Sequence, residues 1–144
     1  MLTVLTIPYD NPASFTQIEK NLRGMQNEVG GLIEHINLLI GKKKYILVVN
    51  EEGRLKDLPV NKKATFLLGK SFGNLFDPAT LTVIVGDCFL VGATANGYKS
   101  IAEDCKDGLL SHVSDEVVNE WWAGNGEKDV EAALKRPLFR IFSF

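Results

Sequence analysis

The sequence predicts an α+β domain with a mainly antiparallel, four- to five-stranded sheet, one long helix packed on a face and short C-terminal helices. Three observations support this fold class. Strand-like runs of apolar residues recur along the chain, and an early segment carries apolar residues at helical spacing. Two of the strand-like stretches also follow one another across a short basic turn.

The first element is a strand at Leu2 to Ile7, which is apolar on both faces and is therefore expected inside the sheet. The run Ser14-Phe15-Thr16-Gln17 fits a capping box, so we expect a helix to start there and to end at Gly30-Gly31. Its apolar stripe would place Leu22 at the centre of a buried face. The stripe comprises Phe15, Ile18, Leu22, Met25 and Val29.

The next two elements form a predicted antiparallel hairpin. Leu32 to Ile40 has a period of two, and the short connection Gly41 to Lys44 leads into a second strand at Tyr45 to Val49. The three lysines of the connection could hold a phosphate or an acidic partner, or could form a solvated turn. The same two interpretations apply to Lys62 and Lys63.

A turn and a short helix are expected after the hairpin. Asn50 to Gly53 is typical of a turn in which Gly53 supplies a positive φ. Asn61 is the expected N-cap of a helix that ends before Gly69. Residues 70–80 then predict a loop whose Phe72 and Phe76 cover the core.

The remaining elements are one strand and two helices. Leu81 to Gly92 predicts the last strong strand, with a bulge or bend at Gly86-Asp87. Ser114 is the expected N-cap of a helix that stops at Gly124, and a second helix spans Glu127 to Lys135.

Length and composition predict one domain. The chain has 144 residues, of which 45% are hydrophobic and 24% are charged, enough for one core and too few for two. We expect residues 1–144 to form a single domain, with an α+β core at 1–95 and a C-terminal helical extension with an aromatic tail at 99–144.

Charge and hydropathy exclude several classes of protein. A formal net charge of −2 and a pI near 5.7 give no overall attraction to a polyanion, which argues against a general nucleic-acid or membrane binder. The start of the chain lacks the basic and apolar regions of a signal peptide. No apolar run approaches the roughly 20 residues that span a bilayer. We therefore expect a cytoplasmic protein.

The residues that most often carry catalysis or bind metals are sparse. Cys88 and Cys105 have no second Cys or His at metal-ligand spacing, so we expect reduced thiols and neither a metal nor a cofactor. His35 and His112 lack a patterned nucleophile beside them and are interpreted as structural.

Three short elements carry a family resemblance. They are Val29-Gly30-Gly31, Asn50-Glu51-Glu52-Gly53 and Leu58-Pro59-Val60-Asn61, within a similarity that covers about residues 1 to 95. On these elements the chain resembles a small family, domain of unknown function 3846, found in bacteriophages, plasmids and mobile elements of bacteria. The resemblance implies action in the cytosol of a bacterial host and carries over no catalytic residues. The part after Lys99 departs from the short helix in which family members often end.

Two classes of function remain, with a third as a further alternative. The first is a non-enzymatic phage or mobile-element accessory protein that blocks a host protein, such as a defence protein, or sequesters a small nucleotide-like ligand. The second is a small enzyme whose site would use Asp57, Asn61, Lys62 and Asp87. The third is a nucleic-acid binder that uses the lysine clusters, whose affinity would fall steeply with salt. We expect the ligand or partner site among Asn50, Glu52, Asp57, Asn61, Lys62, Asp87, Trp121 and Trp122.

The adjacent tryptophans also predict a contact surface. Neighbours on a helix point about 100° apart, so one of Trp121 and Trp122 should be buried with Val118 while the other faces the surface. The aromatic tail could add apolar area to this surface, which makes a homo-oligomer possible, or could cover the second tryptophan inside a larger core. The tail residues concerned are Phe139, Ile141, Phe142 and Phe144.

Overall fold

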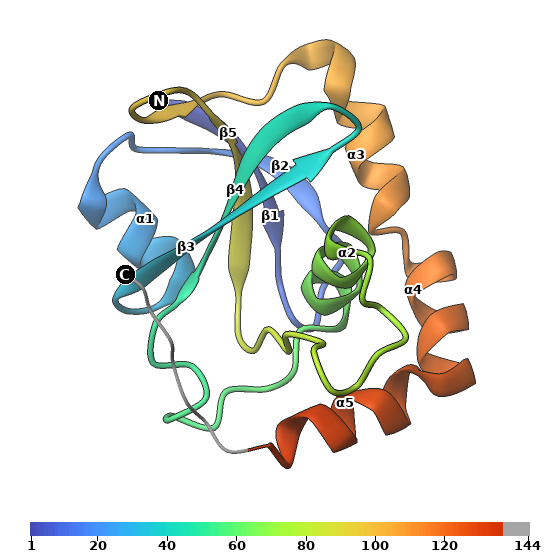
Figure 1. Cartoon of the computed structure of the whole chain (residues 1–144). Helices are drawn as coiled ribbons and strands as arrows, with labels where there is room; N and C mark the ends of the chain where they lie inside the picture. The colour runs from blue at the N-terminus through green and yellow to red at the C-terminus, as the bar shows by residue number, and fades with distance from the viewer. Residues whose placement is uncertain (137–144) are drawn as a thin grey trace.

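A computed structural model describes residues 1–136 and shows an α+β fold with a six-stranded antiparallel sheet (Figure 1). The strands are β1 (Leu2–Ile7), β2 (Ser14–Ile18), β3 (Ile33–Ile40), β4 (Lys43–Asn50), β5 (Cys88–Ala93) and β6 (Tyr98–Lys99). The helices are α1 (Leu22–Val29), α2 (Lys62–Phe72), α3 (Lys106–His112), α4 (Asp115–Trp121) and α5 (Glu127–Leu134). The strand order is β2-β1-β5-β4-β3, and β6 pairs with β5.

Helices cover both faces of this sheet. On one face, Leu5, Leu47 and Leu90 pack against residues of α2 and α3. On the other face, Val48 and Phe89 pack against α1. The predicted interior position of Leu2 to Ile7 is confirmed, because β1 lies between β2 and β5 and contributes apolar side chains to both faces.

The predicted long helix from Ser14 is wrong. Ser14–Ile18 forms strand β2, which pairs with β1, and the Thr6 and Thr16 hydroxyls are 3.1 Å apart across the pair. The helix is only Leu22–Val29, capped by the Asn21 side chain, which accepts a hydrogen bond from Gly24 N at 2.7 Å. Leu22 is consequently 58% exposed and does not lie in the core. The local capping signal was outweighed by the ladder of backbone hydrogen bonds that β1 offers.

The predicted hairpin is confirmed. β3 and β4 pair in an unbroken antiparallel register from Ile33 opposite Asn50 to Ile40 opposite Lys43. Gly41 has a φ of 62°, which provides the turn, and Lys42 is exposed within it.

The expected cap at Asn61 is also confirmed, but the helix is longer than predicted. The Asn61 side chain accepts a hydrogen bond from Ala64 N, and α2 continues through Gly69 to Phe72. A Cβ atom at Gly69 would lie 3.0 Å from the Cα atom of Leu75. Glycine therefore serves here to let the following loop cross the helix closely, and it does not end the helix.

Two details of the connecting loops were wrong. The residue with a positive φ in the turn after β4 is Asp57, at 52°, and not Gly53. Phe72 and Phe76 are 47% and 72% exposed, and Leu75 covers the core in their place.

The last strand is shorter than predicted. β5 begins at Cys88, because Gly86 with a φ of 76° turns the chain immediately before it. Residues 81–85 belong to none of the strands; Val85 forms an isolated antiparallel bridge with Val60, which also lies outside the strands. The side chains of Leu81, Val83 and Val85 contribute to a second core cluster with α4 and α5, whereas Ile84 packs in the cluster with α2 and α3.

The C-terminal helices are joined. A π-helical turn, Trp122–Gly126, connects α4 to α5, so the helix does not stop at Gly124 as expected. Gly126 accommodates the Trp121 ring, since a Cβ atom there would lie 2.8 Å from ring carbons. The predicted helix from Glu127 is confirmed. The predicted packing of the aromatic tail lies outside the described residues. Within residues 1–136, no helix is both long and apolar enough to cross a membrane.

Candidate functional site

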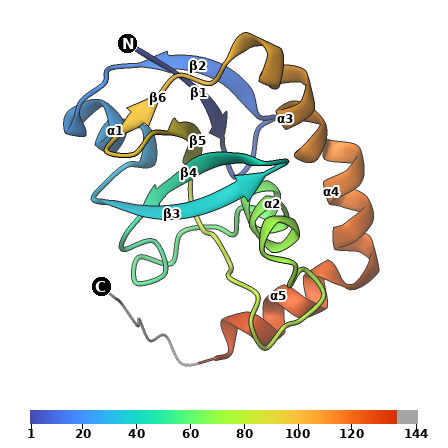
Figure 2. The ribbon, with the colours of Figure 1, turned by 45° about the horizontal axis from the view of Figure 1, so that its top comes forward.

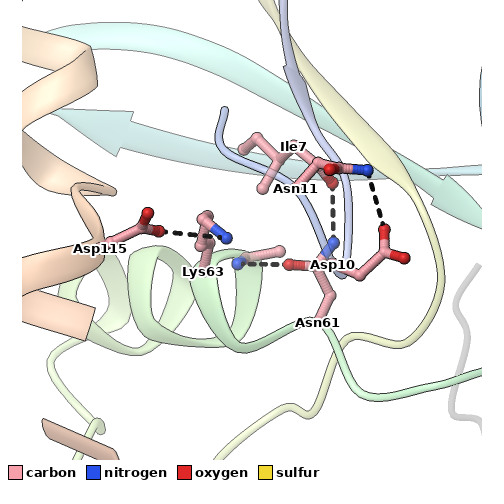
Figure 3. A network of polar contacts seen from close by, with 7 residues as sticks. Ile7, Asp10, Asn11, Asn61, Lys63 and Asp115 are labelled. Carbon is pink, nitrogen blue, oxygen red and sulfur yellow. Dashed lines mark hydrogen bonds and ion pairs between the residues drawn. The ribbon is translucent and has the colours of Figure 1, made fainter. Parts of the chain in front are cut away.

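Asn61, one of the predicted site residues, is fully buried and joins three segments. Its Nδ2 donates to the carbonyl oxygen of Ile7, at 2.8 Å, and its Oδ1 caps α2 (Figure 3). The same Nδ2 also donates to the carbonyl oxygen of Gly86, at 2.9 Å. Every polar atom of the side chain therefore has a partner inside the fold. Figure 3 also shows the ion pair of Lys63 with Asp115, at 3.4 Å, which joins α2 to α4.

Asn50 has a similar structural role at the end of β4. Its Nδ2 donates to Val29 O at 3.1 Å, and its Oδ1 accepts from Glu52 N at 2.9 Å. The side chain is 7% exposed. Asn50 thus ties the end of α1 to the end of the hairpin.

The charged members of the predicted set make contacts with other residues and not with one another. Glu52 pairs loosely with Lys56 at 4.0 Å, and Asp57 is exposed in the same loop. Asp87 accepts a hydrogen bond from Tyr9 N at 3.1 Å. Lys62 lies on α2 with its Nζ 4.4 Å from the centroid of the Trp122 ring.

The two tryptophans differ in burial, as predicted. Trp121 is 6% exposed and packs with Val118, and its ring centroid lies 5.6 Å from that of Phe66. Trp122 is partly buried beside it, under Lys62. Cation–π contact with Lys62 thus covers part of the tryptophan that was expected to face the surface.

A cavity of about 850 Å³ lies elsewhere, between the β3–β4 hairpin and the segment from Ala93 to Tyr98. We call it the sheet-end pocket. Its polar lining includes His35, Asn37, Lys44, Asn96 and Tyr98, and its apolar lining includes Leu39, Ile46 and Phe72. None of the eight predicted site residues lines it.

The strand register explains why these side chains converge. Asn37 lies opposite Ile46, and Leu39 lies opposite Lys44, so all four share one face of the sheet. The same face carries α1 farther along the hairpin. β5 pairs with both β4 and β6, which brings Tyr98 to this face.

Tyr98 and His35 form the best-defined contact of the pocket. The Tyr98 hydroxyl and His35 Nε2 are 2.5 Å apart, and the ring centroids are 5.5 Å apart. Burial raises the pKa of Tyr98. The Tyr98 hydroxyl can donate to the imidazole where His35 Nε2 carries no proton. The pair fixes two rings at one wall of the pocket.

A second cavity, of about 550 Å³, lies beside the first. It shares Thr94, Asn96, Gly97 and Tyr98 with the sheet-end pocket and adds Lys20 and Leu22 from the other side. The β5–β6 segment is therefore a wall between two cavities.

The sheet-end pocket offers an aromatic surface, side-chain amides and one lysine. Such a set can stack a planar ring, bind its edge by hydrogen bonds and neutralise an anionic group. The described residues include no group of three or more His, Cys, Asp or Glu that could hold a metal ion.

Sequence reasoning missed this pocket for identifiable reasons. His35 was interpreted as structural, and Asn96-Gly97 predicts a turn. The polar residues at alternate positions of β3 were a weak signal, because an alternating strand is also expected to face water on one side. The pairing of β5 with both β4 and β6 brings the separate segments together.

Comparison with known proteins identifies a family but no characterised relative. A family model described as "Domain of unknown function (DUF3846)" matches residues 2–114, so the match extends beyond residue 95 and includes α3. No curated protein and no solved structure matches the chain.

Proposed function

The chain belongs to the family described as Domain of unknown function (DUF3846), and on that premise we propose that it is a non-enzymatic binding protein that takes up a small nucleotide-like ligand. The sheet-end pocket is the proposed binding site. The observation that carries the proposal is the convergence of Tyr98, Asn37 and Lys44 on one cavity. Its volume of about 850 Å³ lies within the range of roughly 300–1,000 Å³ typical of small-molecule sites.

Each part of a nucleotide has a matching group in the pocket. The ring pair of Tyr98 and His35 supports stacking of a base. The Asn37 and Asn96 amides can both donate and accept hydrogen bonds, as the edge of a base requires. Lys44 supplies a positive charge for a phosphate group.

The biological role that we propose is sequestration. In the setting that the family resemblance implies, a phage or mobile element inside a bacterial cell, a small protein that binds a nucleotide signal removes it from its receptor. Such a role requires affinity and no turnover. The ligand should therefore be recovered chemically unchanged from the complex.

Calorimetric titration with AMP, ATP and adenosine tests the proposal. We expect Lys44→Ala to weaken AMP or ATP binding by about tenfold or more, because a charge-assisted hydrogen bond contributes about 1.5–3 kcal/mol. Adenosine, which lacks the phosphate, should be unaffected by this change. Lys42→Ala is the matched control, because Lys42 lies in the turn of the same hairpin, two residues before Lys44, but does not line the pocket.

Asn37→Ala provides the second variant and should weaken all three ligands. Absence of binding by every nucleotide tested would count against the proposal, as would affinities that neither Lys44→Ala nor Asn37→Ala changes. Conversion of the ligand during incubation would instead favour the enzyme alternative. Mass spectrometry of small molecules extracted from the protein after purification from a bacterial lysate would identify the natural ligand.

A further inference from the structure

β3 is an edge strand with one neighbour. Figure 2 shows it as the outermost strand of the sheet, with β4 on one side. The carbonyl oxygen of Leu32 accepts a hydrogen bond from Glu51 N at 2.8 Å, which fixes the hydrogen-bonding phase of the hairpin. In an antiparallel pair, alternate residues point both backbone groups at the partner strand. The even-numbered residues of β3 therefore bond to β4, and the odd-numbered residues point their N–H and C=O groups outward.

One outward group is already occupied. The Ser71 hydroxyl, from the end of α2, donates to the Leu39 carbonyl at 2.7 Å. Within residues 1–136, the sheet offers no strand to the outward groups of Ile33, His35 and Asn37. The open part of the edge is thus a continuous set of three residues with His35 at its centre.

Apart from Glu34 and the Ser71 contact, the edge lacks the usual features that prevent strand pairing. Ile33–Ile40 contains no proline, glycine or lysine, and its register with β4 has no bulge. Exposed apolar side chains flank it at both ends. Leu32 is 50% exposed at one end, and Leu39 and Phe72 are 56% and 47% exposed at the other.

We propose that this edge binds a second copy of the chain, by antiparallel pairing of the two β3 strands about a two-fold axis at His35. Ile33 of each copy then lies opposite Asn37 of the other, and the outward backbone groups of both strands bond to one another. A two-fold axis reverses one strand relative to the other. The Leu39 end of one copy therefore meets the Leu32 and Ile33 end of the second copy.

Self-complementarity is the reason for choosing a second copy as the partner. Both ends of the edge are apolar, so reversing the strand places Leu32 opposite Leu38 and Ile33 diagonal to Leu39 of the second copy, with His35 opposite His35 at the axis. Glu34, the charged side chain of β3, lies opposite Ile36 of the second copy and meets no like charge. The sheet-end pocket is lined by Asn37, Leu39 and Phe72, so the second copy would border its open side.

Light scattering of the full chain over a range of concentrations tests the proposal. We expect a mass that rises to twice the 15.9 kDa of one chain. His35→Pro should remain monomeric and folded, because proline removes an outward N–H that the fold does not use, and proline is tolerated on edge strands. Circular dichroism and the thermal transition report whether the variant is folded.

A second pair of variants keeps the test decisive if His35→Pro fails to fold. Leu39→Lys should raise the dimer dissociation constant at least tenfold by placing a charge against the apolar end of the second copy. Val117→Lys is its matched control, since Val117 is an exposed apolar residue on α4, and it should leave the mass unchanged. In the parent chain, the amides of Ile33, His35 and Asn37 should exchange more slowly as concentration rises.

Two results would overturn the proposal. One is a monomeric mass for the parent chain at every concentration up to the millimolar range. The other is a dimer that persists unchanged in Leu39→Lys. Neither result bears on ligand binding, so this inference and the proposed function fail independently.

Discussion

Asn61 connects the start of α2 to two other parts of the chain through one side-chain amide. The bonds to the carbonyls of Ile7 and Gly86 hold the end of β1 and the turn before β5 against the helix. Because the residue is fully buried, water cannot replace these partners. A local capping residue is therefore also a long-range connection.

Replacement of Asn61 should separate the two roles. We expect Asn61→Ala to lower the free energy of unfolding by about 3 kcal/mol or more, because the helix cap is lost and two buried carbonyl groups lose the hydrogen bonds that Asn61 donates. Asn61→Asp keeps the capping acceptor but loses both donors, so it should also be strongly destabilised. Urea unfolding measures both. An Asn61→Asp variant as stable as the parent would show that the two donated bonds contribute nothing.

The position of Gly53 leaves no room for a side chain, because Val85 lies close to it. A Cβ atom there would lie 2.7 Å from Val85 Cγ2 and 3.4 Å from the Val85 carbonyl oxygen. We expect Gly53→Ala to destabilise by about 1 kcal/mol or more through overpacking, although its φ is not positive. The cost should shrink when Gly53→Ala is made in a Val85→Ala background. Equal costs in the two backgrounds, measured by denaturant unfolding, would rule out the steric cause.

The raised pKa of Tyr45 predicts that the folded chain loses stability in alkali. Burial, followed by its hydrogen bond to Cys105, raises the pKa of Tyr45 to about 12 from an ordinary value of 10.0. The folded chain thus keeps a proton that the unfolded chain releases. This contribution to stability is complete below about pH 10 and is lost as pH rises toward 12. Burial raises the pKa of Cys88 as well, with an effect of the same sign.

A comparison of variants isolates the tyrosine. The thermal midpoint of the parent chain should fall between pH 10 and pH 12 more steeply than that of Tyr45→Phe, which has no phenol to ionise. Parallel curves for the two proteins would mean that Tyr45 titrates alike in the folded and unfolded chain.

At the scale of elements, the apolar stripe that was predicted for one long helix is divided between strand β2 and helix α1. Ile18 lies at the end of β2, whereas Met25 and Val29 lie on the helix, and all three are buried in one cluster. Leu22 occupies the first helical position, where the side chain turns away from that cluster. The helix therefore contacts the sheet through Met25 and Val29 and not through Leu22.

This division predicts opposite outcomes for two similar substitutions. Leu22→Asp should change the free energy of unfolding by no more than about 0.5 kcal/mol, because the side chain is exposed. Met25→Asp should unfold the domain, since a buried carboxylate costs several kcal/mol against a total stability of about 5–15 kcal/mol. Thermal unfolding followed by circular dichroism compares them. If Leu22→Asp unfolded the chain, the first helix would have to begin earlier than Leu22.

At the scale of the whole molecule, the C-terminal helices are bound to the rest by one cluster. Phe66 of α2 and Leu81 and Val83 of the loop pack against Trp121 of α4 and Val130 of α5. Arg136 also donates to the carbonyl of Ala79 at 2.6 Å. We therefore expect the sheet and the C-terminal helices to unfold together.

Trp121→Ala tests this cooperativity. The cavity should cost about 3–5 kcal/mol, whereas the matched variant Trp122→Ala should cost less, because Trp122 is only partly buried. In Trp121→Ala, hydrogen exchange should accelerate for sheet and helix amides alike. Sheet amides that stay protected while α4 and α5 exchange would identify a separate C-terminal unit.

The sequence by itself determined the elements whose signals are local. The period of two in residues 32–40, the apolar run Tyr45 to Val49 and the short connection from Gly41 predicted the hairpin, and the capping side chain of Asn61 predicted the start of α2. These features depend on neighbours a few residues apart, so the sequence contains all that they require.

Tertiary structure decided the elements whose hydrogen-bonding partners are distant in the chain. Ser14–Ile18 became a strand because β1 was available to pair with it, and Gly69 lies inside α2, where it leaves room for Leu75 to cross the helix. The sheet-end pocket formed because β5 pairs with both β4 and β6. Strand order and register place a side chain relative to residues far away in the sequence, and no local pattern specifies which strands will be neighbours.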